Sequence, residues 1–239
     1  TQVWVNGFYY KLSGSEAIVT GTTKSFQNTP LVFPETINYG GQTYQVTTIA
    51  PSAIRLQGSL AKTVRLSQII GNSIEKFYGG GSFVDDADLV SISFPKLKVI
   101  ATTGFTFGGS KLTSLNLPSL EEILSAENFC KNATSLVTLS LPKLKKISNS
   151  RFCFTNLTNA TSISMPELEL LYGNELFEGT FNTGVTFSLP KLSEIGGLSV
   201  FYNLSGLTSL SLPSLTKIDD HSYSILKNLP TLKKLSIPS

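Results

Sequence analysis

Leu112-Thr-Ser-Leu115-Asn-Leu117-Pro118 is a seven-residue phrase that recurs along this chain of 239 residues. It returns as Leu136-Val-Thr-Leu139-Ser-Leu141-Pro142 and as Leu207-Thr-Ser-Leu210-Ser-Leu212-Pro213. The prolines of successive copies are 23, 24, 24, 24, 23 and 25 residues apart, at Pro95, Pro118, Pro142, Pro166, Pro190, Pro213 and Pro238. Because so short a copy can bury its apolar face only against its neighbours, the period predicts a stacked solenoid.

Each copy has the same apolar columns when it is numbered from its proline. Apolar residues one and three positions before the proline alternate with polar ones, which predicts a short strand with one face inward. Two and five positions after the proline come further apolar residues, such as Leu120 and Ile123. We expect these columns to form the core. The variable remainder of each copy carries an aromatic residue expected to close the convex side: Phe105, Phe129, Phe152, Phe177, Phe201 or Tyr223.

Ten positions before the proline, several copies share a turn residue. Four of them place an asparagine there (Asn132, Asn156, Asn203 and Asn228), and another places Gly108. Both residue types tolerate left-handed backbone, so this column predicts the end of a short helical turn before the strand.

The first fifty residues do not follow the repeat. Strand-like runs at 4–12 and 17–20 flank Ser13-Gly-Ser-Glu16, and runs at 37–39 and 42–46 flank Gly40-Gly41. Both patterns are typical of β-hairpins. We therefore expect residues 1–50 to form an N-terminal β cap and residues 51–239 to form the solenoid, with regular repeats from about residue 89.

The composition is that of a folded protein with a neutral polar surface. The chain is 41% hydrophobic and 15% charged, with a net charge of +3. It contains no apolar run of 18 residues, so we expect no transmembrane segment, and its first residues do not resemble a signal peptide. Three positions after the proline the charge alternates in sign along Lys98, Glu121, Lys145 and Glu169, which predicts opposite charges on adjacent coils. No unbroken basic stripe remains, so we expect no binding of nucleic acid.

Two polar columns of the predicted strands point outward and make the candidate binding surface. They consist of small side chains: Ser93, Asn116, Ser140, Ser164, Ser188 and Ser211 in one column, and Ser114, Thr138, Ser162, Thr186 and Ser209 in the other. Parallel strands lie about 4.8 Å apart, so these residues would form ladders along an exposed sheet. The ladders have two explanations. In the first, small hydroxyl side chains only stabilise the sheet and keep it soluble. In the second, they form a flat hydrogen-bonding platform for a polypeptide or a glycan.

The sequence offers no set of catalytic or metal-binding residues. His221 is the only histidine, and it has no nucleophile and orienting acid that can be assigned to it. The acidic clusters, Asp85-Asp86 with Asp88 and Glu121-Glu122, lack the opposed placement that glycoside hydrolysis needs. Gly79-Gly80-Gly81 is not followed by the Lys-Ser/Thr of a phosphate loop. We expect no enzyme, no cofactor and no metal site.

The two cysteines, Cys130 and Cys153, lie one repeat apart. Each aligns with a phenylalanine of the neighbouring copy, so buried thiols in a core column and a disulfide are both open, and the spacing favours the thiols.

The repeats resemble the leucine-rich repeats of the BspA-like family of bacterial surface proteins. The resemblance is carried by the Leu-x-x-Leu-x-Leu-Pro-x-Leu-x-x-Ile phrase, by Asn128-Phe-Cys-Lys-Asn-Ala-Thr-Ser-Leu136 and by Tyr39-Gly-Gly-Gln-Thr-Tyr-Gln-Val-Thr-Thr-Ile49. It implies a mainly β leucine-rich repeat solenoid, with a parallel sheet and short helical or irregular convex segments. The chain departs from the family in its Pro-Lys/Ser-Leu insert and in lacking the common Ala-Phe of the variable segment.

The resemblance also implies an exported protein, extracellular or at the cell surface, with no catalytic residues. Our interpretation is a non-enzymatic binding or adhesion module, monomeric, whose partner is a host extracellular-matrix or cell-surface protein, or a glycan. The alternative is a passive scaffold or spacer within a larger surface assembly.

Overall fold

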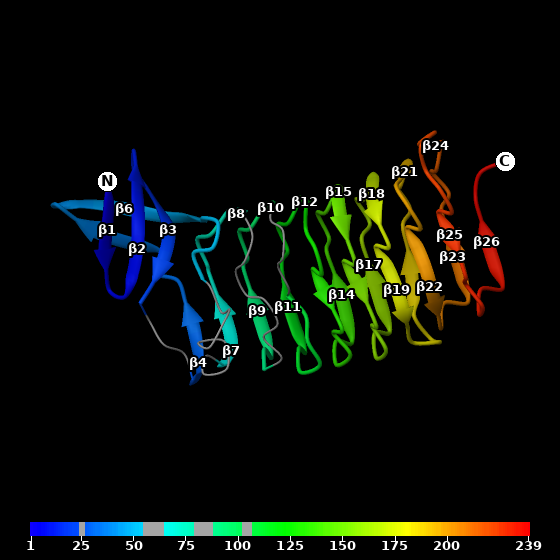
Figure 1. Cartoon of the computed structure of the whole chain (residues 1–239), viewed down its shortest axis with the longest axis horizontal. Coiled ribbons are helices and arrows are strands. Elements are labelled where there is room, and N and C mark those ends of the chain that lie inside the picture. Colours follow the sequence, from blue (N-terminus) through cyan, green and yellow to red (C-terminus); the bar gives the residue numbers. More distant parts are fainter. Residues whose placement is uncertain (24–26, 55–64, 79–87, 102–106) are drawn as a thin grey trace.

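The chain is an elongated stack of coils that runs from a β-rich N-terminal end to β26, the last strand (Figure 1). The computed structural model describes residues 1–23, 27–54, 65–78, 88–101 and 107–239. Neighbouring coils pair through parallel strands, so the predicted parallel solenoid is confirmed. Within the described ranges no helix has the length and apolar character that crossing a membrane requires.

The strands of the coils lie in three layers, which we call the first, second and third sheet; among the described residues the second is divided into three separately hydrogen-bonded blocks, and the third begins at β13. The first sheet holds the strands that follow the proline: β8 (Lys76–Tyr78), β10 (Val99–Ala101), β12 (Glu122–Leu124), β15 (Lys146–Arg151), β18 (Leu170–Asn174), β21 (Glu194–Gly196) and β24 (Lys217–Ile218). The second sheet holds those that precede it: β4 (Gln27–Val32), β7 (Arg65–Ile70), β9 (Ser91–Ser93), β11 (Ser114–Asn116), β14 (Thr138–Ser140), β17 (Ser162–Ser164), β20 (Thr186–Ser188), β23 (Ser209–Ser211) and β26 (Lys234–Ser236). The third sheet holds β13 (Cys130–Lys131), β16 (Phe154–Thr155), β19 (Phe177–Thr180), β22 (Phe201–Ser205) and β25 (Leu226–Lys227).

The proline makes the corner between the second and the first sheet. In one coil the amide of Leu120 donates to the carbonyl of Leu117, 3.3 Å away, and the equivalent bond joins Leu144 to Leu141. Pro118 is therefore the second residue of a four-residue turn, the position that its fixed φ suits best. The leucine two positions after the proline closes this turn and enters the core.

The N-terminal strands form antiparallel hairpins. They are β1 (Gln2–Val5), β2 (Phe8–Ser13), β3 (Glu16–Thr22), β5 (Thr36–Tyr39) and β6 (Gln42–Ile49). The parallel pairing of β3 with β6 joins them to the first sheet. Both predicted hairpins are present, as β2–β3 and as β5–β6 around Gly40 and Gly41, which have φ of 59° and 80°. The run expected as one strand at 4–12 is instead two strands, because Asn6 and Gly7 have positive φ and turn the chain. The boundary near residue 50 stays a prediction, since β4 pairs with β7 and β6 with β8 across it.

The apolar columns are buried as predicted along most of the solenoid. The residues five positions after the proline, such as Ile123, Ile147 and Ile195, are fully buried. The columns become exposed in the last coils, where Ile218, Leu235 and Ile237 are 52%, 43% and 55% exposed.

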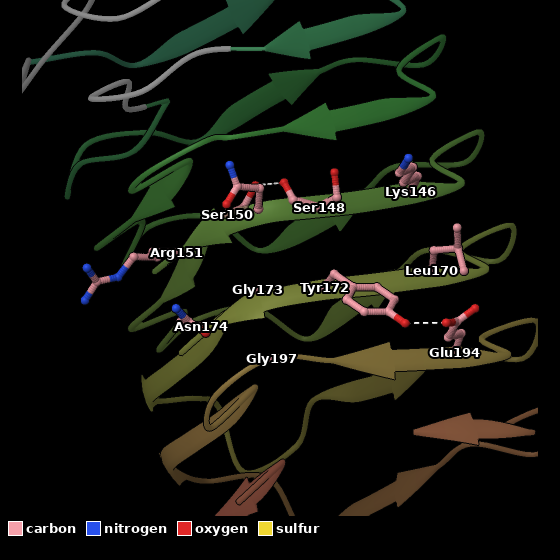
Figure 2. A pocket seen from close by; sticks show the side chains of 11 residues that line it. Lys146, Ser148, Ser150, Arg151, Leu170, Tyr172, Gly173, Asn174, Glu194 and Gly197 are labelled. Atoms are coloured by element: carbon pink, nitrogen blue, oxygen red, sulfur yellow. Dashed lines mark hydrogen bonds between the residues drawn. The ribbon is translucent and has the colours of Figure 1, made fainter. Parts of the chain in front are cut away.

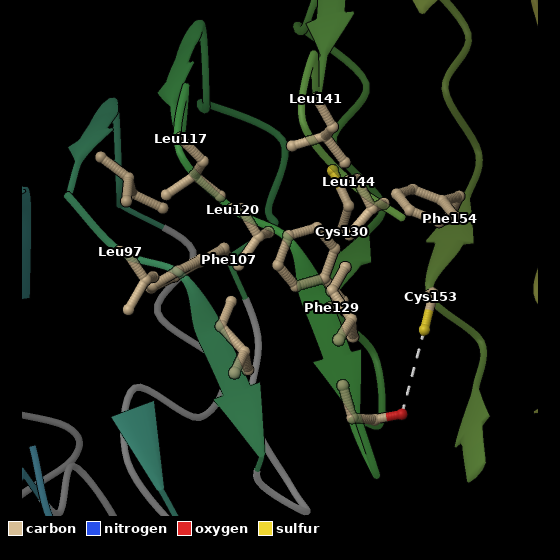
Figure 3. Close-up of a cluster of buried hydrophobic side chains, with 14 of the residues drawn as sticks. Leu97, Phe107, Leu117, Leu120, Phe129, Cys130, Leu141, Leu144, Cys153 and Phe154 are labelled. Atoms are coloured by element: carbon tan, nitrogen blue, oxygen red, sulfur yellow. Dashed lines mark hydrogen bonds between the residues drawn. The ribbon is translucent and has the colours of Figure 1, made fainter. Parts of the chain in front are cut away.

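Phenylalanine rings form a continuous stack inside the third sheet. The ring centroids of Phe107, Phe129, Phe154, Phe177 and Phe201 follow at 6.1, 5.8, 4.9 and 5.0 Å. Figure 3 shows the first three of these rings among leucines from the proline corners. The prediction was right for Phe129, Phe177 and Phe201. It was wrong for Phe152, which is partly exposed while Phe154 fills the column, and for Tyr223, which is 70% exposed. Phe105 lies outside the described residues.

The short helical turn expected at the asparagine column is wrong. Asn132, Asn156, Asn203 and Asn228 do have left-handed backbone, with φ between 45° and 54°. They lie at strands of the third sheet, however, and the described part of each coil has no helix there. Left-handed backbone can end or bend a strand as well as a helix, and the asparagine pattern alone did not separate the two.

Candidate binding surfaces

The outward side chains of the second sheet form a neutral surface, which we call the hydroxyl face. It comprises the predicted columns on β9, β11, β14, β17, β20 and β23: Ser91, Ser93, Ser114, Asn116, Thr138, Ser140, Ser162, Ser164, Thr186, Ser188, Ser209 and Ser211. All of these residues are exposed or partly exposed. Their neighbours on the strands, such as Leu139 and Ile163, are buried. The chain's own loops therefore leave this face open.

The hydroxyl face is divided into blocks and does not form one unbroken ladder. Strand pairing joins β7 to β9 and β9 to β11, then β14 to β17 and β17 to β20, then β23 to β26. In the described residues no strand pairing joins β11 to β14 or β20 to β23. In the first block Asn116 Nδ2 donates to Ser93 Oγ at 2.9 Å. The central block carries Thr138, Ser140, Ser162, Ser164, Thr186 and Ser188 in register.

A column of β-branched residues borders the hydroxyl face. Five positions before the proline, valine and threonine alternate as Val90, Thr113, Val137, Thr161, Val185 and Thr208. The Oγ1 atoms of Thr113 and Thr161 donate to the carbonyls of Val90 and Val137 in the preceding coils. Val137 is half exposed. Sequence reasoning missed this column, although its alternation is visible once the prolines are aligned.

The alternating charges do not pair where we expected them to. Backbone bonds stack Glu121 on Lys98 and Lys145 on Glu121. The described ion pairs lie in other columns: Lys191–Glu167 at 2.6 Å, Lys217–Glu194 and Lys111–Asp88 at 2.5 Å, and Arg151–Glu175 at 3.9 Å. Two of these pairs join side chains one and four positions after the proline to the same column of the neighbouring coil.

The first sheet carries a hollow on its outer face. It has a volume of about 620 Å³ and lies over β15, β18 and β21. Figure 2 shows Lys146 at one end, Arg151 and Asn174 at the other, and Tyr172 with its hydroxyl directed at Glu194. The hydroxyl donates to Glu194 Oε1, which also accepts from Lys217 Nζ at 2.5 Å. Sequence reasoning missed this hollow. The signal was the column six positions after the proline, where Tyr172 is followed one coil later by Gly196.

A second hollow, of about 450 Å³, lies on the third sheet between Lys131, Phe152 and Glu178. The asparagine column borders it, and Asn156 Nδ2 donates to Asn132 Oδ1 at 2.8 Å. Burial, and then the nearby Glu175, raise the pKa of Glu178. These bonds explain the asparagines structurally, because Asn156 bonds to Asn132 and Asn228 bonds to Asn203, in each case in the same column of the preceding coil.

The two cysteines are buried and are not joined by a disulfide. Cys130 is in register with Phe154, as the sequence alignment predicted, and Cys130 N donates to the carbonyl of Cys153 at 2.6 Å. Burial raises the pKa of both thiols to about 12. Figure 3 shows them inside the coils. Such thiols are core residues, since a neutral, buried thiol is a poor nucleophile and a poor metal ligand.

The remaining candidates for chemistry do not converge. The side chain of His221 is 93% exposed, and its Nδ1 lies 4.0 Å from Asp219. Asp88 pairs with Lys111, while Asp85, Asp86 and Gly79-Gly80-Gly81 lie outside the described residues. Where the structure describes the chain, no three His, Cys, Asp or Glu side chains gather as metal ligands would.

A family model described as "BspA type Leucine rich repeat region" matches residues 78–199 and 126–239, with six copies. This chain belongs to the BspA-type leucine-rich repeat family. The resemblance noted in the sequence is thereby confirmed. No protein with a curated description matches the chain.

The chain is similar to solved structures of bacterial leucine-rich repeat proteins, at low identity and low TM-score. A leucine-rich cell surface protein from Faecalibacterium prausnitzii is 12% identical, with a TM-score of 0.37, and the match covers 100% of this chain and 95% of that one. The pneumococcal vaccine antigen PcpA is 19% identical with a TM-score of 0.39, over 100% and 82% of the two chains. The Treponema pallidum leucine-rich repeat protein is 16% identical with a TM-score of 0.39, over 99% and 82%.

Proposed function

We propose that this protein is a non-enzymatic binding module, exported to the cell surface or secreted, and that the central block of its hydroxyl face contacts an extracellular polypeptide. The observation that carries the proposal is the open, neutral and in-register array of hydroxyl groups on β14, β17 and β20. Each hydroxyl can donate and accept, so the array can bond to peptide N–H and C=O groups without burying a charge. Membership of the BspA-type family supports the proposal of a surface location.

A polypeptide suits this face better than a glycan. None of the residues that define the face is aromatic, so a sugar has no ring on which to stack, and the half-exposed Val137 borders the face. Apolar contact beside a row of hydrogen-bonding groups matches the alternation of side chains and amides in an extended peptide.

The test is binding of the purified chain to immobilised collagen, laminin and fibronectin, measured by biolayer interferometry. The decisive variant changes Ser140, Ser164 and Ser188 together to glutamate, which places three like charges on adjacent strands. A control variant places the same three charges on exposed loop residues, as Ser110→Glu, Asn159→Glu and Thr183→Glu. We expect saturable binding that the first variant weakens at least about tenfold and the control leaves unchanged, because a buried unpaired charge costs more than 1 kcal/mol.

Two outcomes would overturn the proposal. Equal loss in both triple variants would show a general charge effect and not a binding face. No binding to any of the proteins at high micromolar concentration would favour the passive scaffold. A circular-dichroism unfolding curve for each variant separates loss of binding from loss of fold.

A further inference from the structure

The hollow on the first sheet has the size and chemistry of a small-ligand site. Its volume of about 620 Å³ lies inside the range of about 300–1,000 Å³ that is typical of such sites. It lies over β15, β18 and β21, on a different sheet from the hydroxyl face. A ligand here would leave the proposed polypeptide surface free.

The ring of Tyr172 lies against the neighbouring strand within this hollow, and we call this ring the platform. A Cβ built at Gly196, in register with Tyr172 on the next strand, would stand 2.2 Å from Cε1 and 2.5 Å from Cδ1 of the tyrosine ring. The ring thus occupies the space that any side chain at position 196 would fill, and it covers Gly196, which is buried. The other side of the ring faces the hollow, and Tyr172 stays partly exposed (Figure 2).

The ring is also held in orientation. Its hydroxyl donates to Glu194 Oε1, and Lys217 Nζ fixes the same oxygen from the next strand. The hydrogen bond to Glu194 raises the pKa of Tyr172, so the phenol stays protonated and keeps donating. A ring held in place loses little conformational entropy when a ligand stacks on it.

Polar groups surround the platform. Asn174 Oδ1 accepts from the amide of Leu198 at 2.9 Å, so the group that Asn174 offers a ligand is its Nδ2, which has two hydrogens to donate. Asn149 Nδ2 donates to Ser125 Oγ at 3.1 Å, which leaves its carbonyl oxygen as an acceptor. Lys146 adds a cationic donor at the opposite end.

We propose that this hollow binds a pyranose unit of a carbohydrate, with the apolar face of the sugar stacked on Tyr172 and its hydroxyls bonded to Asn149, Asn174 and Lys146. The face of an aromatic ring is electronegative, and the axial C–H groups of a pyranose present weakly positive hydrogens to it. The sugar's hydroxyls are both donors and acceptors, which matches a rim that supplies both. The proposal does not depend on the hydroxyl face.

The test uses saturation-transfer-difference NMR of the whole chain with a panel of methyl pyranosides, neutral and carboxylated, followed by titration of those that bind. Tyr172→Ala removes the platform and should weaken binding about tenfold or more. Gly196→Ala keeps the tyrosine but drives its ring off the strand. The atoms that have to yield belong to one side-chain ring and not to the backbone, so the fold should survive while binding falls similarly. Tyr202→Ala is the matched control, because it removes another partly exposed tyrosine from β22 of the third sheet.

The expected pattern is loss of the sugar signal in Tyr172→Ala and Gly196→Ala, with Tyr202→Ala unchanged. The proposal is overturned if no pyranoside binds the wild-type chain at millimolar concentration, or if binding persists in both hollow variants. A sugar displaced by the triple glutamate change on the hydroxyl face, and not by Tyr172→Ala, would place carbohydrate binding there instead.

Discussion

From β9 to β23 the second sheet exposes small, neutral side chains, whereas the first sheet exposes lysine, glutamate and tyrosine over the same core. Both sheets bury equivalent columns, and Ile163 under the second sheet is as inaccessible as Ile147 under the first. The outward partners differ: Ser162 and Ser164 flank Ile163, while Lys146 and Ser148 flank Ile147. The core fixes where each strand lies, so the outer columns are free to be uniform on one side and varied on the other. A uniform side suits an extended ligand, and a varied side can build one local site.

The largest expected change is in the free energy of unfolding of core variants. It tests whether the two sheets share one core. Ile147→Ala and Ile163→Ala each remove a buried side chain from a coil, and we expect each to lower the free energy of unfolding by about 2–5 kcal/mol. Urea denaturation followed by circular dichroism measures both. Val137→Ala, at a half-exposed site beside the hydroxyl face, is the control and should change stability by less than about 0.5 kcal/mol. A cost below about 1 kcal/mol at either isoleucine would contradict the idea of a shared core.

The next effect concerns backbone contacts beside the first sheet. Gly197, directly after β21, has φ of +117°, and a Cβ there would stand 1.9 Å from the carbonyl oxygen of Gly173. Backbone cannot yield as a side chain can, so Gly197→Ala should destabilise the protein by about 2 kcal/mol or more. Differential scanning calorimetry gives the change in Tm. Gly184→Ala is the control, since its nearest neighbour, Asn182 Oδ1, is 3.4 Å away. Equal stability of the two variants would show that the coils shift to accept a side chain.

The smallest expected effect is on the pH dependence of stability. It arises from a carboxyl group on the first sheet and has no counterpart on the hydroxyl face. Hydrogen bonds from Lys217 and then Tyr172 lower the pKa of Glu194. A carboxyl whose pKa is lower in the folded than in the unfolded chain stabilises the fold above its ordinary pKa of about 4.3, and this contribution is lost as the pH falls through the lower folded value. Because the pair is exposed, the effect on stability should be small.

A carbon-detected NMR titration of the Glu194 carboxyl measures this effect. In Lys217→Met its pKa should rise towards the ordinary value, and the same midpoint in both proteins would contradict the proposed coupling. The serines and threonines of the hydroxyl face do not titrate in this range, so that face should make no contribution to the pH dependence.

Much of the fold followed from the spacing of the prolines and leucines. Pro118 and its equivalents predicted the period. The alternation of Leu115 and Leu117 with polar residues predicted the strand, and the repeated columns of Leu120 and Ile123 predicted the core. The third sheet was not predictable in the same way. Its strands are as short as two residues, and the left-handed asparagines that accompany them are equally compatible with a helix end.

The two candidate surfaces also differ in whether the sequence repeat could reveal them. Ser140, Ser164 and Ser188 could be identified because they repeat, whereas the hollow depends on one tyrosine meeting one glycine across adjacent coils. The repeat pattern also failed to predict which charges pair. The alternating charges at Glu121 and Lys145 predicted an ion pair in that column, whereas Glu194 and Lys217 pair in another. Which side chains meet depends on how each corner turns, and the repeat pattern does not specify that.

The uneven pairing of the two sheets has a mechanical consequence. The first sheet links the coils from β8 to β24 by strand pairing, while in the described part of the second no strand pairing joins β11 to β14 or β20 to β23. A load that bends the solenoid would therefore meet a stiff band on one side and two compliant points on the other. We expect the molecule to flex about the first sheet, with the central block of β14, β17 and β20 moving as one rigid segment between those points.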